Sequence, residues 1–138
     1  MLELYYKNKL KYNNYIVFIK VGNFYECLSK DALIINKIFN YKIKKISNTI
    51  KVGFPISNIK YITGKIKDNN INYVVIDKDN IIDINEVDNN DYINYNFDID
   101  NILYNYIRIE KIIKYLNDFI MNKEFCYKLD KIEEIIKD

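Results

Sequence analysis

An apolar ring and a carboxylate lie close together near the start of the chain. In the stretch KVGNFYECLSKDA, which runs from Lys20 to Ala32, the ring of Phe24 is followed two residues later by the carboxylate of Glu26. Residues two apart on an extended chain point to the same side. An apolar ring can wedge into a base step, and a carboxylate can accept a hydrogen bond from a base N–H. On an extended chain, Phe24 and Glu26 would thus point the same way, but this spacing alone does not establish a site.

The elements around this stretch must present those side chains. The apolar run YIVFIKV, at 15–21, is rich in β-branched residues and predicts a central strand covered on both faces. Gly22 follows it and permits a backbone turn that a residue with a Cβ would resist. Taken alone, Phe24 after an apolar strand is typical of a core residue, and Glu26 alone is typical of a solvated acid. Tyr25 points opposite to Phe24, so we expect Tyr25 in the core.

The first part of the chain carries further helix and strand signals. Periodicity predicts helices at 2–11, at 29–39 behind an N-cap at Ser29, and at 57–68 behind an N-cap at Ser57; it predicts a hairpin at 41–54 and strands at 71–77 and 80–87. This order indicates an α/β fold, a mixed β-sheet flanked by helices. We expect this domain to span 1–87.

The last part of the chain is predicted to be helical. Residues 88–98 are acidic, rich in Asn and poorly patterned, which predicts a linker, and residues 99–138 form the helical tail. Its first helix runs from Asp98 or Asp100 to Met121. Apolar residues recur on that helix at three- and four-residue spacing, at Ile102, Leu103, Tyr106, Ile109, Ile113, Leu116 and Ile120. Further apolar residues lie elsewhere around it, so we expect the helix to pack both on its own domain and on another chain, either a second copy or a repair-protein partner.

Composition excludes several classes of function. The chain has 138 residues, a formal net charge of +2 and no histidine, and its two cysteines, Cys27 and Cys126, lie far apart. No catalytic constellation is visible, so we expect a protein that is not an enzyme and that uses no metal and no cofactor. The N-terminus is too charged for a signal peptide, and no apolar run has membrane-spanning length. We therefore expect a cytoplasmic protein without a membrane partner, at the nucleoid if it binds DNA.

The motif around Phe24 resembles the opening of MutS DNA mismatch-repair proteins, whose N-terminal domain reads the mismatch. The matching positions are Gly22, Phe24, Tyr25, Glu26, Asp31 and Ala32. A second match, Gly53-x-Pro55 followed by a helix and a strand, comes at the place expected for that family. The resemblance covers about 1–77. Asn23 departs from it, since the family usually has Asp there.

This resemblance implies that Phe24 wedges into mispaired duplex and that Glu26 bonds a base. It implies structural roles for Gly22, Tyr25 and Gly53, and equally for Asp31 and Pro55. From the residues alone, Asp31 is a first-turn acid that favours its helix dipole. No phosphate loop of the G-x-x-x-x-G-K-[ST] type occurs in the chain, so the ATPase activity of the family is not carried over.

The lysines of the predicted hairpin allow two interpretations. Lys42, Lys44 and Lys51 alternate with apolar residues and could contact phosphates. Equally, they are the wet face of an edge hairpin, where lysine protects against pairing with another sheet.

Two functions therefore stand side by side. The chain is expected to be a DNA-binding module that reads mismatched or distorted double-stranded DNA. Alternatively, it is an interaction protein that keeps the fold and acts through residues 99–138, on itself or on a repair-protein partner.

Overall fold

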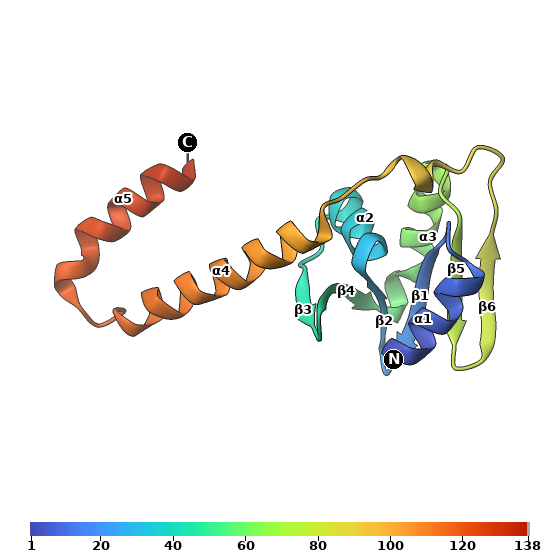
Figure 1. The fold of residues 1–138 in the computed structure, drawn as a ribbon, viewed down its shortest axis with the longest axis horizontal. Helices are drawn as coiled ribbons and strands as arrows, with labels where there is room; N and C mark the ends of the chain where they lie inside the picture. Colours follow the sequence, from blue (N-terminus) through green and yellow to red (C-terminus); the bar gives the residue numbers. More distant parts are fainter. Residues whose placement is uncertain (138) are drawn as a thin grey trace. The chain divides into compact units, whose positions relative to one another are not determined.

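A mixed six-stranded sheet organises the computed structural model, which describes residues 1–137 (Figure 1). The strands are β1 (Ile16–Val21), β2 (Phe24–Leu28), β3 (Lys44–Ile46), β4 (Thr49–Pro55), β5 (Tyr73–Asp77) and β6 (Asn80–Asn85). They lie in the order β3-β4-β2-β1-β5-β6. β1 and β5 run parallel, and the other neighbouring strands run antiparallel. The predicted α/β fold with a mixed sheet is confirmed.

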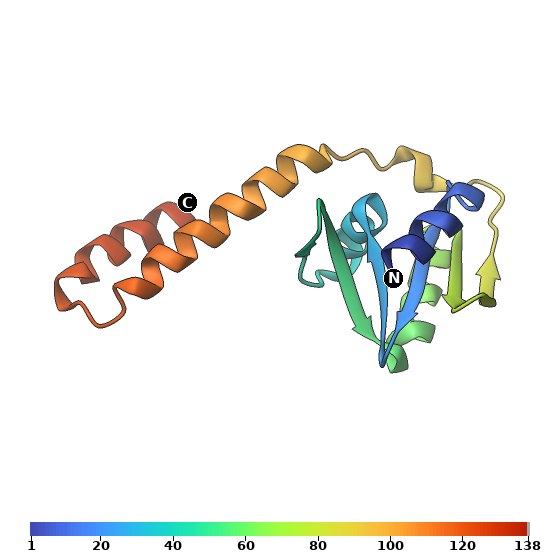
Figure 2. The ribbon, with the colours of Figure 1, turned by 60° about the horizontal axis from the view of Figure 1, so that its bottom comes forward.

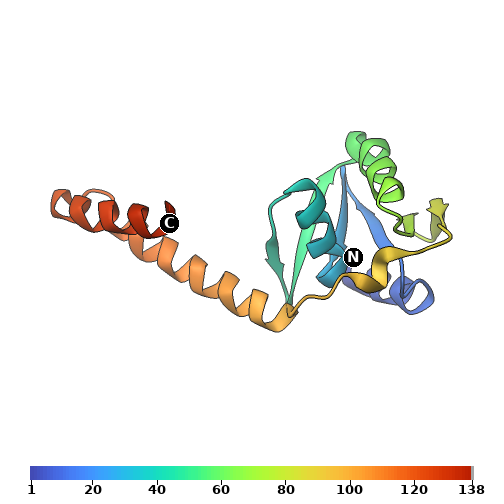
Figure 3. The same cartoon turned by 90° about the horizontal axis from the view of Figure 1, so that it is seen from above.

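Helices cover both faces of this sheet. α1 (Leu2–Lys11) lies against one face, and α2 (Ser29–Phe39) and α3 (Ile59–Asp68) lie against the other (Figures 2 and 3). As a result, Ile16 to Ile19 in β1 are all buried. On the α2 and α3 side, the ring of Phe54 packs edge-on against Phe18, with centroids 5.5 Å apart. The mainly apolar run at 15–21 is thus explained by a strand whose first four residues, 16–19, are covered on both faces.

Strand β2 is the main difference from the sequence prediction, which placed only a strand end and a turn before α2. β1 and β2 form a hairpin in which Val21 is paired with Phe24. Gly22 lies in its turn with φ +60°, a conformation that favours glycine. β2 is short, and its pairing with both β1 and β4 makes it a central strand. Those partners are distant in sequence, so periodicity alone did not reveal it.

The start of α2 also differs from the prediction. Ser29 does not cap the helix with its side chain. Its backbone has φ +52°, and its hydroxyl shares a hydrogen bond of 2.7 Å with the hydroxyl of Thr49 on β4. The serine therefore ties the β2–α2 junction to the neighbouring strand.

Residues 88–98, predicted to be an acidic linker, contact the sheet domain through Tyr92. This residue lies in the short 3-10 helix η2 (Asp91–Asn94), and its side chain is buried. Nearby, the side-chain amide of Asn90 accepts from the backbone N–H of Asn72 and donates to the carbonyl of Asn14. The compact unit that contains the sheet extends to Asp100.

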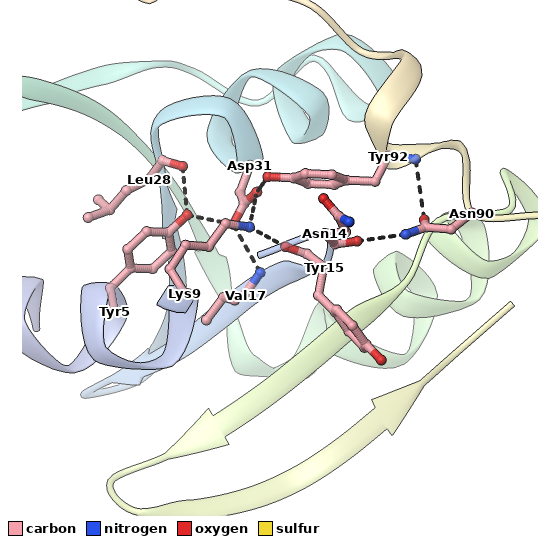
Figure 4. A network of polar contacts seen from close by, with 9 residues as sticks. All are labelled: Tyr5, Lys9, Asn14, Tyr15, Val17, Leu28, Asp31, Asn90 and Tyr92. Carbon is pink, nitrogen blue, oxygen red and sulfur yellow. Dashed lines mark hydrogen bonds and ion pairs between the residues drawn. The ribbon is translucent and has the colours of Figure 1, made fainter. Parts of the chain in front are cut away.

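A buried carboxylate joins these elements. Asp31 lies in the first turn of α2 and has no exposed surface. Figure 4 shows its polar contacts. Asp31 accepts hydrogen bonds from the hydroxyls of Tyr5 at 2.5 Å and Tyr92 at 2.7 Å, and from the backbone N–H of Val17 at 3.1 Å. The ammonium of Lys9 forms an ion pair with it at 3.0 Å. Burial, and next the charge of Asp31, raise the pKa of both tyrosine hydroxyls well above their usual value, so both remain donors.

The second unit begins at Asn101 and consists of helices. α4 (Ile99–Asp118) and α5 (Cys126–Lys137) are joined through the 3-10 helix η3 (Lys123–Phe125), and the rings of Phe119 and Phe125 stack with centroids 4.6 Å apart. Within residues 99–137, no side chain of α4 or α5 is buried. No helix in the described part of the chain has both the length and the apolar character needed to cross a membrane.

The Asp31 network predicts a large loss of stability on its removal. Asp31→Ala leaves Lys9 without its counter-charge and buried donors without an acceptor, so we expect the free energy of unfolding to fall by about 3–5 kcal/mol. Urea unfolding followed by circular dichroism measures this loss. Asp88→Ala, at an exposed acid, is the control and should change stability by less than about 0.5 kcal/mol. Equal losses in the two variants would contradict a central role for Asp31.

Candidate nucleic-acid interface

The side chains predicted to contact DNA gather on one part of the sheet. An open cavity of about 470 Å³ is lined by Phe24, Glu26, Tyr41, Lys42, Lys44, Lys51 and Gly53. This set contains every residue that the sequence analysis predicted for DNA contact, together with Gly53 of the second motif. Residues from β2, β4 and the β3 edge thus line a single surface, although they come from separate stretches of chain.

Strand register explains why they meet. Glu26 on β2 lies opposite Gly53 on β4, Leu28 lies opposite Lys51, and Lys51 lies opposite Lys44 on β3. Residues that are directly opposite in a ladder share one face, and so do residues two apart on a strand. Phe24, Glu26, Lys51 and Lys44 therefore share a face.

The alternation expected along β2 is present. The side chain of Phe24 is 49% exposed, whereas that of Tyr25 is 7% exposed. Tyr25 packs near Phe54, with ring centroids 6.2 Å apart. One ring of the pair thus reaches solvent and the other serves the core.

Glu26 is held by a lysine. Glu26 is only 9% exposed. Its Oε2 lies 2.9 Å from Nζ of Lys51, and its Oε1 lies 3.4 Å from the same nitrogen. Sequence reasoning missed this ion pair and treated Lys51 like the other hairpin lysines. The signal needed to find it was the pairing of β2 with β4, which the sequence did not reveal.

Glycine at position 53 gives Glu26 its room. A Cβ there would lie 3.3 Å from Cγ of Glu26 and 3.5 Å from the carbonyl oxygen of Tyr25. The first distance is closer than an ordinary van der Waals contact. Pro55, two residues on, lies opposite Phe24 in the register. The residues of the Gly53-x-Pro55 motif therefore lie directly opposite Glu26 and Phe24 on the neighbouring strand.

The two remaining lysines are placed differently from Lys51. Lys42 and Lys44 are exposed, and no ion pair or hydrogen bond involves their ammonium groups within the part of the chain that the structure describes. Their charge is available to an anionic partner, whereas that of Lys51 is engaged by Glu26.

Comparison with known proteins finds one family and one similar protein. Residues 1–82 match the family model of MutS domain I. Among curated proteins, the chain is similar to the DNA mismatch repair protein MutS of Borreliella afzelii (strain PKo), with 35% identity over 66 residues. The aligned part covers 48% of this chain and 8% of that protein, so the chain matches a small fraction of the length of its relative.

Two glycines allow the packing around Glu26 to be tested. Gly64 lies in α3 with open space where a Cβ would be, so Gly64→Ala should raise the free energy of unfolding by about 0.5–1 kcal/mol. Gly53→Ala meets Glu26, so we expect it to give no such gain. Paired urea unfolding curves make this comparison. A gain from Gly53→Ala equal to that from Gly64→Ala would show that Glu26 is not fixed over this strand.

Proposed function

The chain belongs to the MutS domain I family, and from this premise we propose that it is a DNA-binding module that reads mispaired or distorted duplex. The observation that supports this most directly is the half-exposed ring of Phe24 beside Glu26, on a surface lined with lysines. In this proposal Phe24 is the wedge and Glu26 is the hydrogen-bonding group.

Phe24 would distinguish mispaired from paired duplex through the free-energy cost of unstacking the bases. Inserting a ring between base steps costs a few kcal/mol, and the cost is lowest where a base is already mispaired. Phe24 projects from the strand that follows the Gly22 turn, and Tyr25 anchors the same strand in the core. Because the strand is anchored, insertion of Phe24 is expected to deform the duplex and not to move the protein.

The lysines supply the part of the affinity that does not depend on sequence. Ammonium groups of Lys42 and Lys44 displace counterions from the phosphates, which makes binding sensitive to salt. A single small module buries ~600–1,000 Å² of its surface on DNA. We therefore expect binding in the micromolar range or weaker, with no hydrolysis of ATP by the described domain. The proposed place of action is the cytoplasm, at the nucleoid.

A second candidate function is association through the tail. On α4, apolar residues recur at alternating four- and three-residue steps, at Ile102, Tyr106, Ile109, Ile113 and Leu116. Such spacing is that of a coiled-coil seam. Ile109 and Ile113 on this seam are exposed, by 55% and 45%. We propose that the seam pairs with a second copy of the chain or with a repair-protein partner.

The wedge proposal predicts separate effects for three neighbours. Phe24→Ala should bring the ratio of affinities for mismatched over matched duplex close to one, while the salt-sensitive term stays, because the lysines supply it. Glu26→Ala should change the order of preference among mismatches. Tyr25→Ala should lower the free energy of unfolding by about 3 kcal/mol, as truncation of a core aromatic does.

The measurement is a binding titration on matched and G·T-mismatched duplexes at two salt concentrations. Equal binding of both duplexes by the wild type, or an unchanged ratio in Phe24→Ala, would leave association through the tail as the function.

The tail proposal predicts a change of mass. If the seam pairs two copies, Ile109→Lys with Ile113→Lys should convert a concentration-dependent dimer to monomer in light scattering. Tyr104→Lys is the matched control, because Tyr104 is 60% exposed and lies away from the seam, so the dimer should persist. A wild-type monomer at high concentration, with no partner recovered, would count against pairing.

A further inference from the structure

We infer that Lys51 is a positioning residue that sets the preference for mismatched duplex by holding the carboxylate of Glu26, and that it is not a phosphate contact of the kind proposed for Lys42 and Lys44. The inference rests on the proposed function, because it concerns how the same surface reads a mispaired base.

The geometry ties the Lys51 ammonium to both oxygens of Glu26, at 2.9 and 3.4 Å. Both side chains are largely withdrawn from solvent, with 27% of Lys51 and 11% of Glu26 exposed. An ion pair that water reaches poorly is screened less than one on the open surface. Gly53 leaves the space in which the side chain of Glu26 lies over β4, the strand that also carries Lys51.

A neighbouring charge favours the same arrangement. Lys44 lies directly opposite Lys51 in the β3–β4 ladder. Like charges directly opposite each other in a sheet are destabilising. Pairing with Glu26 offsets the charge of Lys51, while Lys44 stays exposed to solvent.

The ion pair also reduces the repulsion between the Glu26 carboxylate and the phosphates of DNA. Duplex DNA carries one negative charge per ~1.7 Å of helix axis, so a bare carboxylate is repelled as it approaches a base. The ammonium of Lys51 offsets that repulsion. A carboxylate has about four lone-pair sites on its two oxygens, so bonding one ammonium leaves acceptor capacity for a base N–H. Lys51 thus fixes where that acceptor points.

The test is a titration of matched and G·T-mismatched duplexes over a series of salt concentrations. The proteins are the full chain as wild type, Lys51→Met, Lys51→Arg, Lys44→Met, Glu26→Gln, and the double variant of Glu26→Gln with Lys51→Met. Two quantities are compared: the mismatch preference, which is the ratio of the two affinities, and the slope of log affinity against log salt.

For Lys51→Met we expect the mismatch preference to fall about fivefold, as loss of one partly buried ion pair implies, with little change in slope. Lys51→Arg keeps the cation and should keep most of the preference. Lys44→Met should lower affinity for both duplexes and reduce the slope by about 0.9, the value of one phosphate contact, while preserving the preference. In the Glu26→Gln background, Lys51→Met should have no further effect on the preference, because Lys51 acts through Glu26.

The other outcomes overturn either the proposed function or the inference on Lys51 alone. A wild type without mismatch preference overturns the proposed function and the role of Lys51 with it. A wild type with preference that Lys51→Met leaves unchanged, with a slope reduced as in Lys44→Met, overturns the inference alone and makes Lys51 a phosphate contact. A loss of preference in Lys51→Met that is equally large in the Glu26→Gln background also overturns it. Urea unfolding of the same variants checks that each is folded.

Discussion

The buried carboxylate of Asp31 is the contact on which the arrangement of the sheet domain depends. It collects a hydroxyl and an ammonium from α1, a backbone N–H from β1 and a hydroxyl from η2, while lying itself in the first turn of α2. A buried charge is costly unless it is paired and hydrogen-bonded, so the network is stable only when all these elements are in place. The network therefore couples the folding of α1, near the start of the domain, to that of η2, near its end.

The same network fixes the strand that carries the candidate site. The hydroxyl of Tyr5 lies 3.0 Å from the carbonyl of Leu28, the last residue of β2, as well as beside Asp31. The next residue, Ser29, is bonded to Thr49. The C-terminal end of β2 is thus held at its junction with α2. The N-terminal end, at Phe24, follows the Gly22 turn. If Phe24 acts as the proposed wedge, it needs a strand that does not move under load, and these contacts of β2 with the core provide one.

Charge on the candidate interface is divided by position rather than by residue type. Lys42, Lys44 and Lys51 look equivalent along the chain, but β4 lies between β2 and β3 in the sheet. A lysine on β4 reaches Glu26, whereas lysines on the edge face solvent. The protection of an edge by lysine and the binding of phosphates by lysine are compatible uses of the same two residues, Lys42 and Lys44.

Local pattern was enough to predict the helices α1 to α4 and the strands β1 and β5, because hydrophobic periodicity reports which face of a segment is buried. It placed the end of α4 too late, at Met121, whereas the helix ends at Asp118. Alternation alone also predicted that Phe24 and Glu26 face one way and Tyr25 the other. Only the tertiary structure showed that β2 is a central strand, that Lys51 meets Glu26, and that Tyr92 returns to Asp31. These features depend on strand register and on contacts between residues as far apart as 31 and 92, and no local period encodes such pairings.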